Sequence, residues 1–229
     1  MLPWLPRPCE LCRAWSGAAL CPDCLARFAQ PVPRCPRCAL PSPQGQACGP
    51  CLRAPPSYAR AIAAVDYAFP WDRLIVAFKF HHRPELATVL ADRMHDAIEA
   101  DGAGAVDLVL PVPLGPQRLA ERGYNQAWEL ARRLAARRRL PADAVLLQRL
   151  RDTPHQIGLT RPQREHNLRD AMWVEPAHKP HLRERRIALV DDVLTTGVTA
   201  DAAARVLLAA GAASVQLWVL ARTPAPDAP

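Results

Sequence analysis

The sequence lacks any apolar run long enough to cross a membrane. Hydrophobic residues make up 50% of the 229 positions, but charged or polar residues interrupt them well short of the roughly 18 residues that a spanning helix needs. The first residues also lack the basic start and long apolar stretch of a secretion signal. We therefore expect a cytoplasmic protein without membrane insertion, large enough for one ordinary domain and a small additional module.

Lysine and aromatic residues are scarce. Only Lys79 and Lys179 are lysines, so arginine supplies nearly all of the positive charge, and aromatic residues make up 6% of the chain. A formal net charge of +7 favours acidic partners such as nucleic acids. Biased coding also produces much arginine, alanine and proline with little lysine, so the arginine count alone indicates no function.

Cysteine is absent after residue 51, and all eight cysteines lie before that point. They form four Cys-x-x-Cys pairs, two of which complete a tetrahedral Cys₄ zinc site. The gaps between pairs are 8, 10 and 9 residues, which favours the pairing of neighbours and hence a double zinc ribbon. The alternative is cross-bracing of the first pair with the third and the second with the fourth. The predicted ligands are Cys9, Cys12, Cys21 and Cys24 for one Zn²⁺, and Cys35, Cys38, Cys48 and Cys51 for the other.

Disulfides explain the cysteines less well, because a cytoplasmic compartment is reducing, and a redox role would not require four such motifs. A closed Cys₄ site has no position open for catalysis, so we predict structural zinc that stabilises a segment too small to fold alone. Eight thiolates and two Zn²⁺ ions would lower the net charge from +7 to about +3. The charge of residues 1–57 falls to about zero, which removes most of the electrostatic argument for nucleic-acid binding by this segment.

Proline marks a boundary in the chain. Twelve of the 25 prolines lie in the first 56 residues, and we predict a zinc-ribbon module over 1–57 and a second domain over 58–229. Beyond the boundary, strand patterns alternate with helical ones, which predicts an α/β fold with an open, mostly parallel sheet. The predicted strands are 60–68, 107–113, 145–147, 186–192 and 214–221, and the predicted helices are 71–80, 85–100, 115–140 and 200–210.

The stretch 187–199 carries the strongest functional signal. An apolar strand is followed by Asp191 and Asp192, and then by a hydroxyl-rich turn that leads into a helix. Converging backbone N–H groups and the helix dipole make such a turn suitable for a phosphate group. The alternative is a buried strand before a capped helix, but burying two acids without a partner is costly. The turn residues are Thr195, Thr196, Gly197, Val198 and Thr199.

Two further segments are candidate anion sites. Residues 111–126 leave a strand through a proline-rich turn and present Arg118 and Arg122 near a helix start, although these arginines also suit a solvated helix face. Residues 151–167 form a long polar loop, and loops of that length are usually functional or disordered. Its Arg161 and Arg164 can close over a pyrophosphate, whereas the alternative is a mobile surface loop.

Together these motifs resemble the ComF family, also called GntX-like. The resemblance rests on the cysteine array, the Phe-Lys79-Phe segment and the Pro-Val-Pro-Leu turn, followed by three later motifs in order. One of these, Arg122-Gly-Tyr-Asn-Gln126, has tyrosine where the family more often has phenylalanine. The other two are the segment with Arg151, Thr153, Gln156, Arg164 and Asn167, and the Asp-Asp-Val-x-Thr-Thr-Gly segment. The resemblance implies a domain similar to type I phosphoribosyltransferases behind a zinc module, with links to natural competence and to the use of DNA as a nutrient.

The resemblance also implies roles for individual residues. The stretch 187–199 is similar to the phosphoribosyl pyrophosphate signature, with Val198 where many members have glycine or serine. Residues 195–199 would hold the 5′-phosphate, and Asp191 and Asp192 would face the ribose hydroxyls, with Mg²⁺ bridging substrate oxygens. The expected contacts to the pyrophosphate come from Leu114, Gly115, Arg118, Arg122, Arg161 and Arg164.

Two functions remain open at this level. The first is a phosphoribosyltransferase with an unknown acceptor. The second is a non-catalytic adaptor of the DNA uptake machinery that binds single-stranded DNA or DNA uptake proteins. The second draws on a basic run in the helix 115–140, which also suits an exposed helix face; its members are Arg132, Arg133, Arg137, Arg138 and Arg139.

Overall fold

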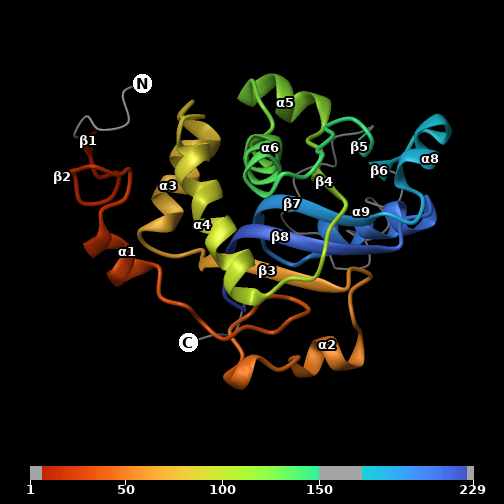
Figure 1. The fold of residues 1–229 in the computed structure, drawn as a ribbon, viewed down its shortest axis with the longest axis horizontal. Helices are drawn as coiled ribbons and strands as arrows, with labels where there is room; N and C mark the ends of the chain where they lie inside the picture. Colours follow the sequence, from red (N-terminus) through yellow and green to blue (C-terminus); the bar gives the residue numbers. More distant parts are fainter. Residues whose placement is uncertain (1–6, 150–171, 226–229) are drawn as a thin grey trace.

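A computed structural model describes residues 7–149 and 172–225. Its centre is a four-stranded parallel sheet in the order β3-β8-β7-β4 (Figure 1). The strands are β3 (Arg60–Asp66), β4 (Leu108–Pro111), β7 (Arg186–Leu194) and β8 (Ser214–Arg222). An open, parallel α/β sheet was predicted, and the structure confirms it.

Both faces of the sheet are covered, which explains why its inner strands read as nearly continuous apolar runs. Val190 and Trp218 pack on one face with α3 (Trp71–Phe80), α4 (Leu86–Asp101) and α6 (Gln126–Arg138). Leu189 and Leu217 pack on the opposite face with α9 (Val198–Ala209). Neighbours in the chain therefore alternate between the two cores, as the period of a strand requires.

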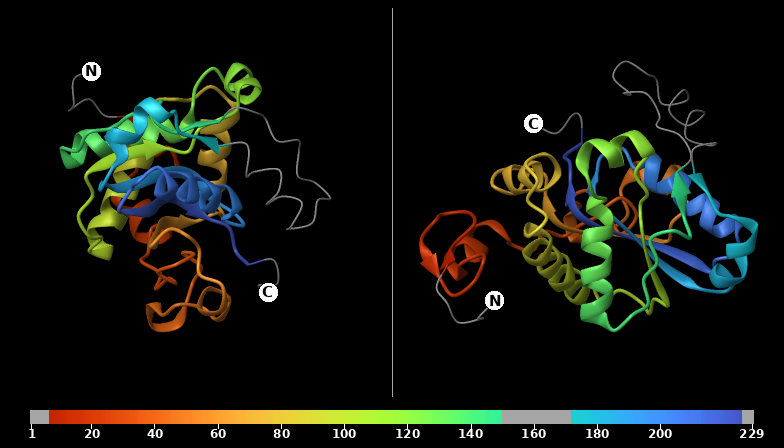
Figure 2. Two further views of the ribbon diagram at one scale, coloured as in Figure 1. Left: turned by 90° about the vertical axis from the view of Figure 1, so that its right-hand side faces the viewer. Right: turned by 90° about the horizontal axis from the view of Figure 1, so that it is seen from above.

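The cysteine-bearing segment packs against this body at two separate places. Its first part contains β1 (Arg7–Pro8), β2 (Trp15–Ser16) and α1 (Pro22–Phe28), and it projects from one end of the molecule (Figure 2, right). Trp71 of α3 donates its indole N–H to the carbonyl of Phe28 at 2.8 Å. The second part contains a 3₁₀ turn (Pro43–Gly45) and α2 (Gly49–Arg53), which lies at the bottom of Figure 1.

Two predictions of secondary structure were wrong. The helix predicted over 115–140 is two helices, α5 (Pro116–Arg122) and α6, because Gly123 takes a left-handed φ of 76° and Asn125 caps α6. The strand predicted at 145–147 is a turn in which the Asp143 carboxylate accepts the N–H groups of Val145 and Leu146. The pairing begins afterwards, where β5 (Gln148–Arg149) runs antiparallel to β6 (Met172–Trp173).

The remaining predicted elements lie close to the observed ones. A short 3₁₀ turn (Pro176–His178) and α8 (Lys179–Leu182) precede β7. Among residues 7–149 and 172–225, no helix is both long and apolar enough to span a bilayer.

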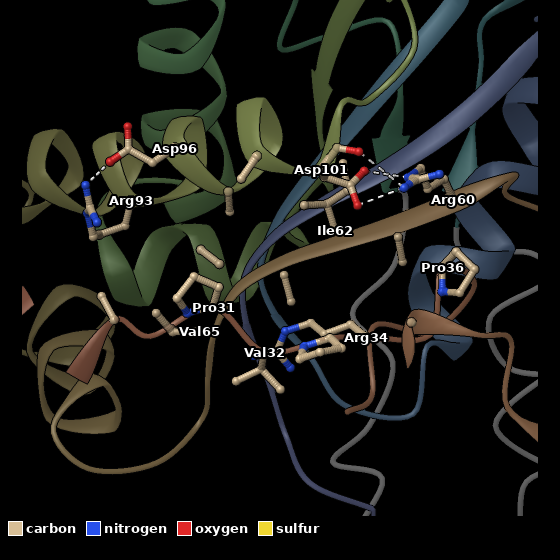
Figure 3. A pocket seen from close by; sticks show the side chains of 18 residues that line it. Pro31, Val32, Arg34, Pro36, Arg60, Ile62, Val65, Arg93, Asp96 and Asp101 are labelled. Atoms are coloured by element: carbon tan, nitrogen blue, oxygen red, sulfur yellow. Dashed lines mark hydrogen bonds and ion pairs between the residues drawn. The ribbon is translucent and has the colours of Figure 1, made fainter. Parts of the chain in front are cut away.

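A pocket of about 680 Å³ lies along the free edge of β3 (Figure 3). It is bounded by β3, by α4 and by the segment 29–36, and the ion pair between Arg60 and Asp101 closes one side of it. Its described lining contains none of the residues predicted to bind phosphate. The predicted site lies instead at the carboxyl ends of the strands, where ligands of open α/β sheets bind.

Candidate functional site

Two adjacent acids lie near the carboxyl end of β7. Asp192 is 7% exposed, and its Oδ1 lies 2.8 Å from Nζ of Lys79, near the end of α3. The carboxylate of Asp191 accepts the backbone N–H of Asp192 at 2.8 Å. Asp191 is partly exposed, whereas Asp192 is buried and has in Lys79 the basic partner that a buried acid requires.

Burial raises the pKa of Asp191 to about 7, and the nearby charge of Asp192 raises it further in the same direction. Lys79 opposes this shift, since its positive charge favours the ionised carboxyl. A carboxyl that titrates near neutral pH beside an ion pair is typical of functional sites. Asp191 can accept a proton or a hydrogen bond from a hydroxyl group in this range.

The predicted phosphate loop, residues 194–199 and called the phosphate loop below, begins two residues after Asp192. Gly197 adopts a φ of 79°, which a side chain disfavours, and this conformation turns the chain into α9. No side chain among the described residues caps this helix, so its first N–H groups remain available to a ligand. Thr195 and Thr196 are exposed, while Val198 is buried.

The proline-rich turn lies beside the acids because β4 pairs in parallel with β7. Pro111 is opposite Val190, and the N–H of Val112 donates to the carbonyl of Val190 at 2.8 Å. Gly115 is buried and precedes α5. Leu114 and Gly115 can offer backbone N–H groups at this edge, whereas Pro116 has none to offer.

The Arg122–Gln126 segment packs on the end of α3. The guanidinium of Arg122 lies 4.9 Å from the ring centroid of Phe80 and donates to the side chain of Gln126 at 2.9 Å. The hydroxyl of Tyr124 donates to the carbonyl of Phe78. The tyrosine that departs from the common family pattern therefore supplies a hydrogen bond to α3. Arg118 lies half-buried on α5.

Lys79 belongs to the candidate site through its ion pair with Asp192, although the sequence did not indicate this position. Its only signal was the Phe-Lys79-Phe segment, which contributed to the family resemblance. Phe78 and Phe80 contact the Arg122–Gln126 segment, while Lys79 pairs with Asp192. Three motifs far apart in the sequence thus meet at one place. Two predicted site residues, Arg161 and Arg164, lie outside the described residues.

The eight cysteines form two separate groups, each with four Sγ atoms within 4.8 Å of one another. The first cysteine group contains Cys9, Cys12, Cys21 and Cys24, and the second contains Cys35, Cys38, Cys48 and Cys51. The structure therefore has the pairing of neighbours, not the cross-braced alternative. Four thiolates at this spacing suit a tetrahedral metal ion.

The basic run on α6 is largely paired with acids. Arg132 and Arg133 both contact Glu129, while Arg137 contacts Asp92. Arg138 contacts Glu99. These pairs reduce the charge that this helix can offer to a polyanion.

No protein-family model matches the chain. DNA utilization protein YhgH of Salmonella typhimurium is 35% identical over 228 residues, which cover 96% of this chain and 98% of that protein. Competence protein F of Haemophilus influenzae is 34% identical over 181 residues, which cover 77% of this chain and 79% of that protein. The likeness therefore extends over nearly the whole chain.

Solved structures give a weaker likeness. An allosteric regulatory enzyme of purine biosynthesis has a TM-score of 0.41 at 17% identity, covering 63% of this chain and 29% of that one. A Trypanosoma cruzi hypoxanthine phosphoribosyl transferase has a TM-score of 0.35 at 16% identity, covering 63% and 66%. These values are too low to assign a substrate.

Proposed function

We propose that this chain, which belongs to the family that contains DNA utilization protein YhgH and Competence protein F, binds phosphoribosyl pyrophosphate at the carboxyl end of β7. The observation that carries the proposal is the acid pair, with Asp192 buried against Lys79, beside the uncapped start of α9. Donors for a phosphate and acceptors for hydroxyl groups lie next to each other there. The names of the two relatives support a role in the uptake or use of DNA.

In this proposal the phosphate loop holds the 5′-phosphate. The backbone N–H groups at the start of α9 donate to the phosphate oxygens, and the helix dipole favours their charge. Thr195, Thr196 and Thr199 add hydroxyl donors. Gly197 allows the backbone to approach the ligand closely.

Asp191 and Asp192 accept hydrogen bonds from the ribose 2′- and 3′-hydroxyls. Their negative charge also stabilises a ribose ring that becomes electron-poor as the bond from C1 to the pyrophosphate breaks. Mg²⁺, which prefers oxygen ligands and keeps several waters, would accompany the substrate and offset the charge of its phosphates. Lys79 fixes the position of the Asp192 carboxylate through their ion pair.

The pyrophosphate lies against the turn after β4. The N–H groups of Leu114, Gly115 and Gln117 and the guanidinium of Arg118 can stabilise the charge that develops on this leaving group. Arg122 would contribute by fixing the turn, because Phe80 and Gln126 already hold its guanidinium. Arg161 and Arg164 are proposed to close over the same group.

Zinc at the two cysteine groups has a structural part in this proposal. We infer that residues 1–57 form a metal-stabilised module and that residues 58–229 form the phosphoribosyl-binding domain. The alternative function, direct DNA binding through α6, is disfavoured by the ion pairs of its arginines with Glu129, Asp92 and Glu99.

Calorimetric titration with phosphoribosyl pyrophosphate and Mg²⁺ tests the site. We expect saturable binding by the wild type, and a loss of about tenfold or more in affinity for each of Asp191→Ala and Asp192→Ala, the scale of one lost charged hydrogen bond. Asp107→Ala is the matched control, because Asp107 pairs with Arg186 at the opposite end of the sheet. Equal affinities in all four proteins would refute the assignment.

A pyrophosphate-release screen against free bases and nucleic-acid fragments tests turnover. Release with one acceptor, abolished by Asp191→Ala, would establish a phosphoribosyltransferase and its acceptor class. Binding without release from any acceptor would leave a phosphoribosyl-binding adaptor as the function.

A further inference from the structure

Hydrogen bonds of Arg222 connect the phosphate loop with the second cysteine group. We infer that Arg222 is a positioning residue that couples the two, so that metal binding by the second cysteine group sets the affinity of the loop for its phosphate. This inference rests on the proposed function. Arg222 itself lies outside both the proposed ligand contacts and the cysteine group.

Arg222 makes the direct connection. It is the last residue of β8 and only 7% exposed. Its Nη1 donates to the carbonyls of Leu194 at 2.9 Å and Thr195 at 2.6 Å, while its Nε donates to the carbonyl of Cys38 at 2.8 Å. A guanidinium holds its donors in a fixed fork, so a shift of the Cys38 carbonyl is transmitted to the loop.

Two further contacts connect the same parts. Tyr58, which is 2% exposed, lies under Gly197, with its hydroxyl 3.4 Å from the point where a Cβ would stand on that glycine. The N–H of Ser57 donates to the carboxylate of Asp201, in the first turn of α9, at 2.6 Å. Residues 57 and 58, which follow the second cysteine group in the chain, therefore contact the phosphate loop and the first turn of α9.

The position of the Cys38 carbonyl depends on the metal. Cys38 belongs to a Cys-x-x-Cys turn whose shape is fixed when both thiolates bind one ion, and its Sγ lies 3.6 Å from Sγ of Cys48. Without the ion, these four cysteines have no common partner that fixes their positions. Loss of the ion would therefore release the turn, and with it the carbonyl that holds Arg222.

The first cysteine group provides a natural control. It packs against α1 and α3, and in the described part of the chain it makes no hydrogen bond to residues 194–201. Arg34 provides a second control. It joins the second part of the module to β3 through the Asp66 carboxylate at 2.7 Å and also donates to the Ala39 carbonyl at 3.1 Å. Among the described contacts it makes no hydrogen bond to residues 194–199.

The test compares Arg222→Lys with Arg34→Lys in the full chain. Zinc content is measured with a chromogenic chelator, phosphoribosyl pyrophosphate affinity by calorimetry with Mg²⁺, and loop order by hydrogen exchange without ligand. We expect Arg222→Lys to keep both zinc ions, to lose about tenfold in affinity, which is ordinary for coupled sites, and to exchange faster at residues 195–199. Arg34→Lys should change affinity by less than about twofold, as for a partly exposed ion pair.

Two cysteine variants test the metal itself. Cys48→Ser/Cys51→Ser and Cys21→Ser/Cys24→Ser each remove the second pair of one group and should each leave one zinc per chain. Only the former should reproduce the faster exchange and weaker binding of Arg222→Lys. Equal effects of the two cysteine variants, or unchanged loop exchange in Arg222→Lys, would overturn the coupling.

The exchange measurement also separates this inference from the proposed function. A wild type that does not bind phosphoribosyl pyrophosphate refutes the proposed function. The exchange rates of residues 195–199 without ligand still decide whether Arg222 and the second cysteine group order the loop. If either cysteine variant fails to fold, Arg222→Lys and Arg34→Lys decide the question.

Discussion

Replacing one acid of the candidate site is expected to stabilise the protein. Burial raises the pKa of Asp191 from 3.8 to about 7, and each unit corresponds to about 1.4 kcal/mol. Ionised Asp191 therefore costs the folded state at most about 4 kcal/mol relative to the unfolded chain. Asn at this position removes the charge and can still accept the N–H of Asp192.

The sign of the pH dependence follows from the same shift. Below pH 3.8 the carboxyl is protonated in both states, and between 3.8 and about 7 only the unfolded chain releases the proton. Wild-type stability therefore falls over this window and stays lower above it. The advantage of Asp191→Asn should be at most about 4 kcal/mol at pH 8 and under about 2 kcal/mol at pH 5.

Thermal and urea unfolding at pH 5 and pH 8 measure this difference. For a chain of this size, 4 kcal/mol corresponds to a rise in Tm of about 10 °C. Zinc binding is also pH-dependent, but its contribution is common to both proteins and cancels in the comparison. The contrasting variant is Asp192→Asn, which leaves Lys79 without its ion-pair partner and should lose about 3 kcal/mol. An Asp191→Asn protein no more stable than wild type at pH 8 would refute the reasoning.

Three further predictions concern the loop, the α3 contact and α6. Gly197→Ala should lose about 1–2 kcal/mol from its positive φ and should also weaken ribose 5-phosphate binding in calorimetry; Gly102→Ala, at a φ of 66° in open space, should show only the stability loss. Tyr124→Phe deletes the hydrogen bond to the Phe78 carbonyl and should lower the free energy of unfolding in urea by at most about 1.5 kcal/mol. The affinity for phosphoribosyl pyrophosphate should stay nearly unchanged, and a tenfold loss would contradict a purely structural role. Because the α6 arginines are paired, the log–log salt slope of single-stranded DNA binding should be shallower than about −2, and a slope near −4 would show that they contact phosphates.

The sequence predicts the sheet well because its strands are buried on both faces. Near-continuous apolar runs identify β7 and β8 without reference to the rest of the fold. The helix α3 was predicted with its observed bounds, since its apolar residues recur at helical spacing. The acid pair and the phosphate loop could be predicted because they lie at the end of a strand that the sequence identifies.

The error in the helix predicted over 115–140 arose at the boundary between two helices. Residues that favour a helix lie on both sides of Gly123 and Asn125, and they concealed a glycine that ends one helix and an asparagine that caps the next. Lys79 and Arg222 escaped because their partners are remote in the chain. Arg222 and Cys38 are 184 residues apart, and no local pattern indicates that they meet.

The charges of the site favour one orientation of the ligand. Asp191, Asp192 and Lys79 sum to one negative charge when both acids are ionised, so the acid pair repels phosphate groups but accepts hydrogen bonds from hydroxyls. The start of α9 has the opposite preference, because its N–H groups attract anions. A ligand with hydroxyls at one end and a phosphate at the other satisfies both, whereas free pyrophosphate satisfies only the second. Without Mg²⁺, ribose 5-phosphate should therefore bind more tightly than pyrophosphate in calorimetry. Asp191→Asn should narrow the difference in affinity between these two ligands, because it removes one of the charges that repel pyrophosphate. Tighter binding of pyrophosphate than of ribose 5-phosphate by the wild type would contradict this orientation.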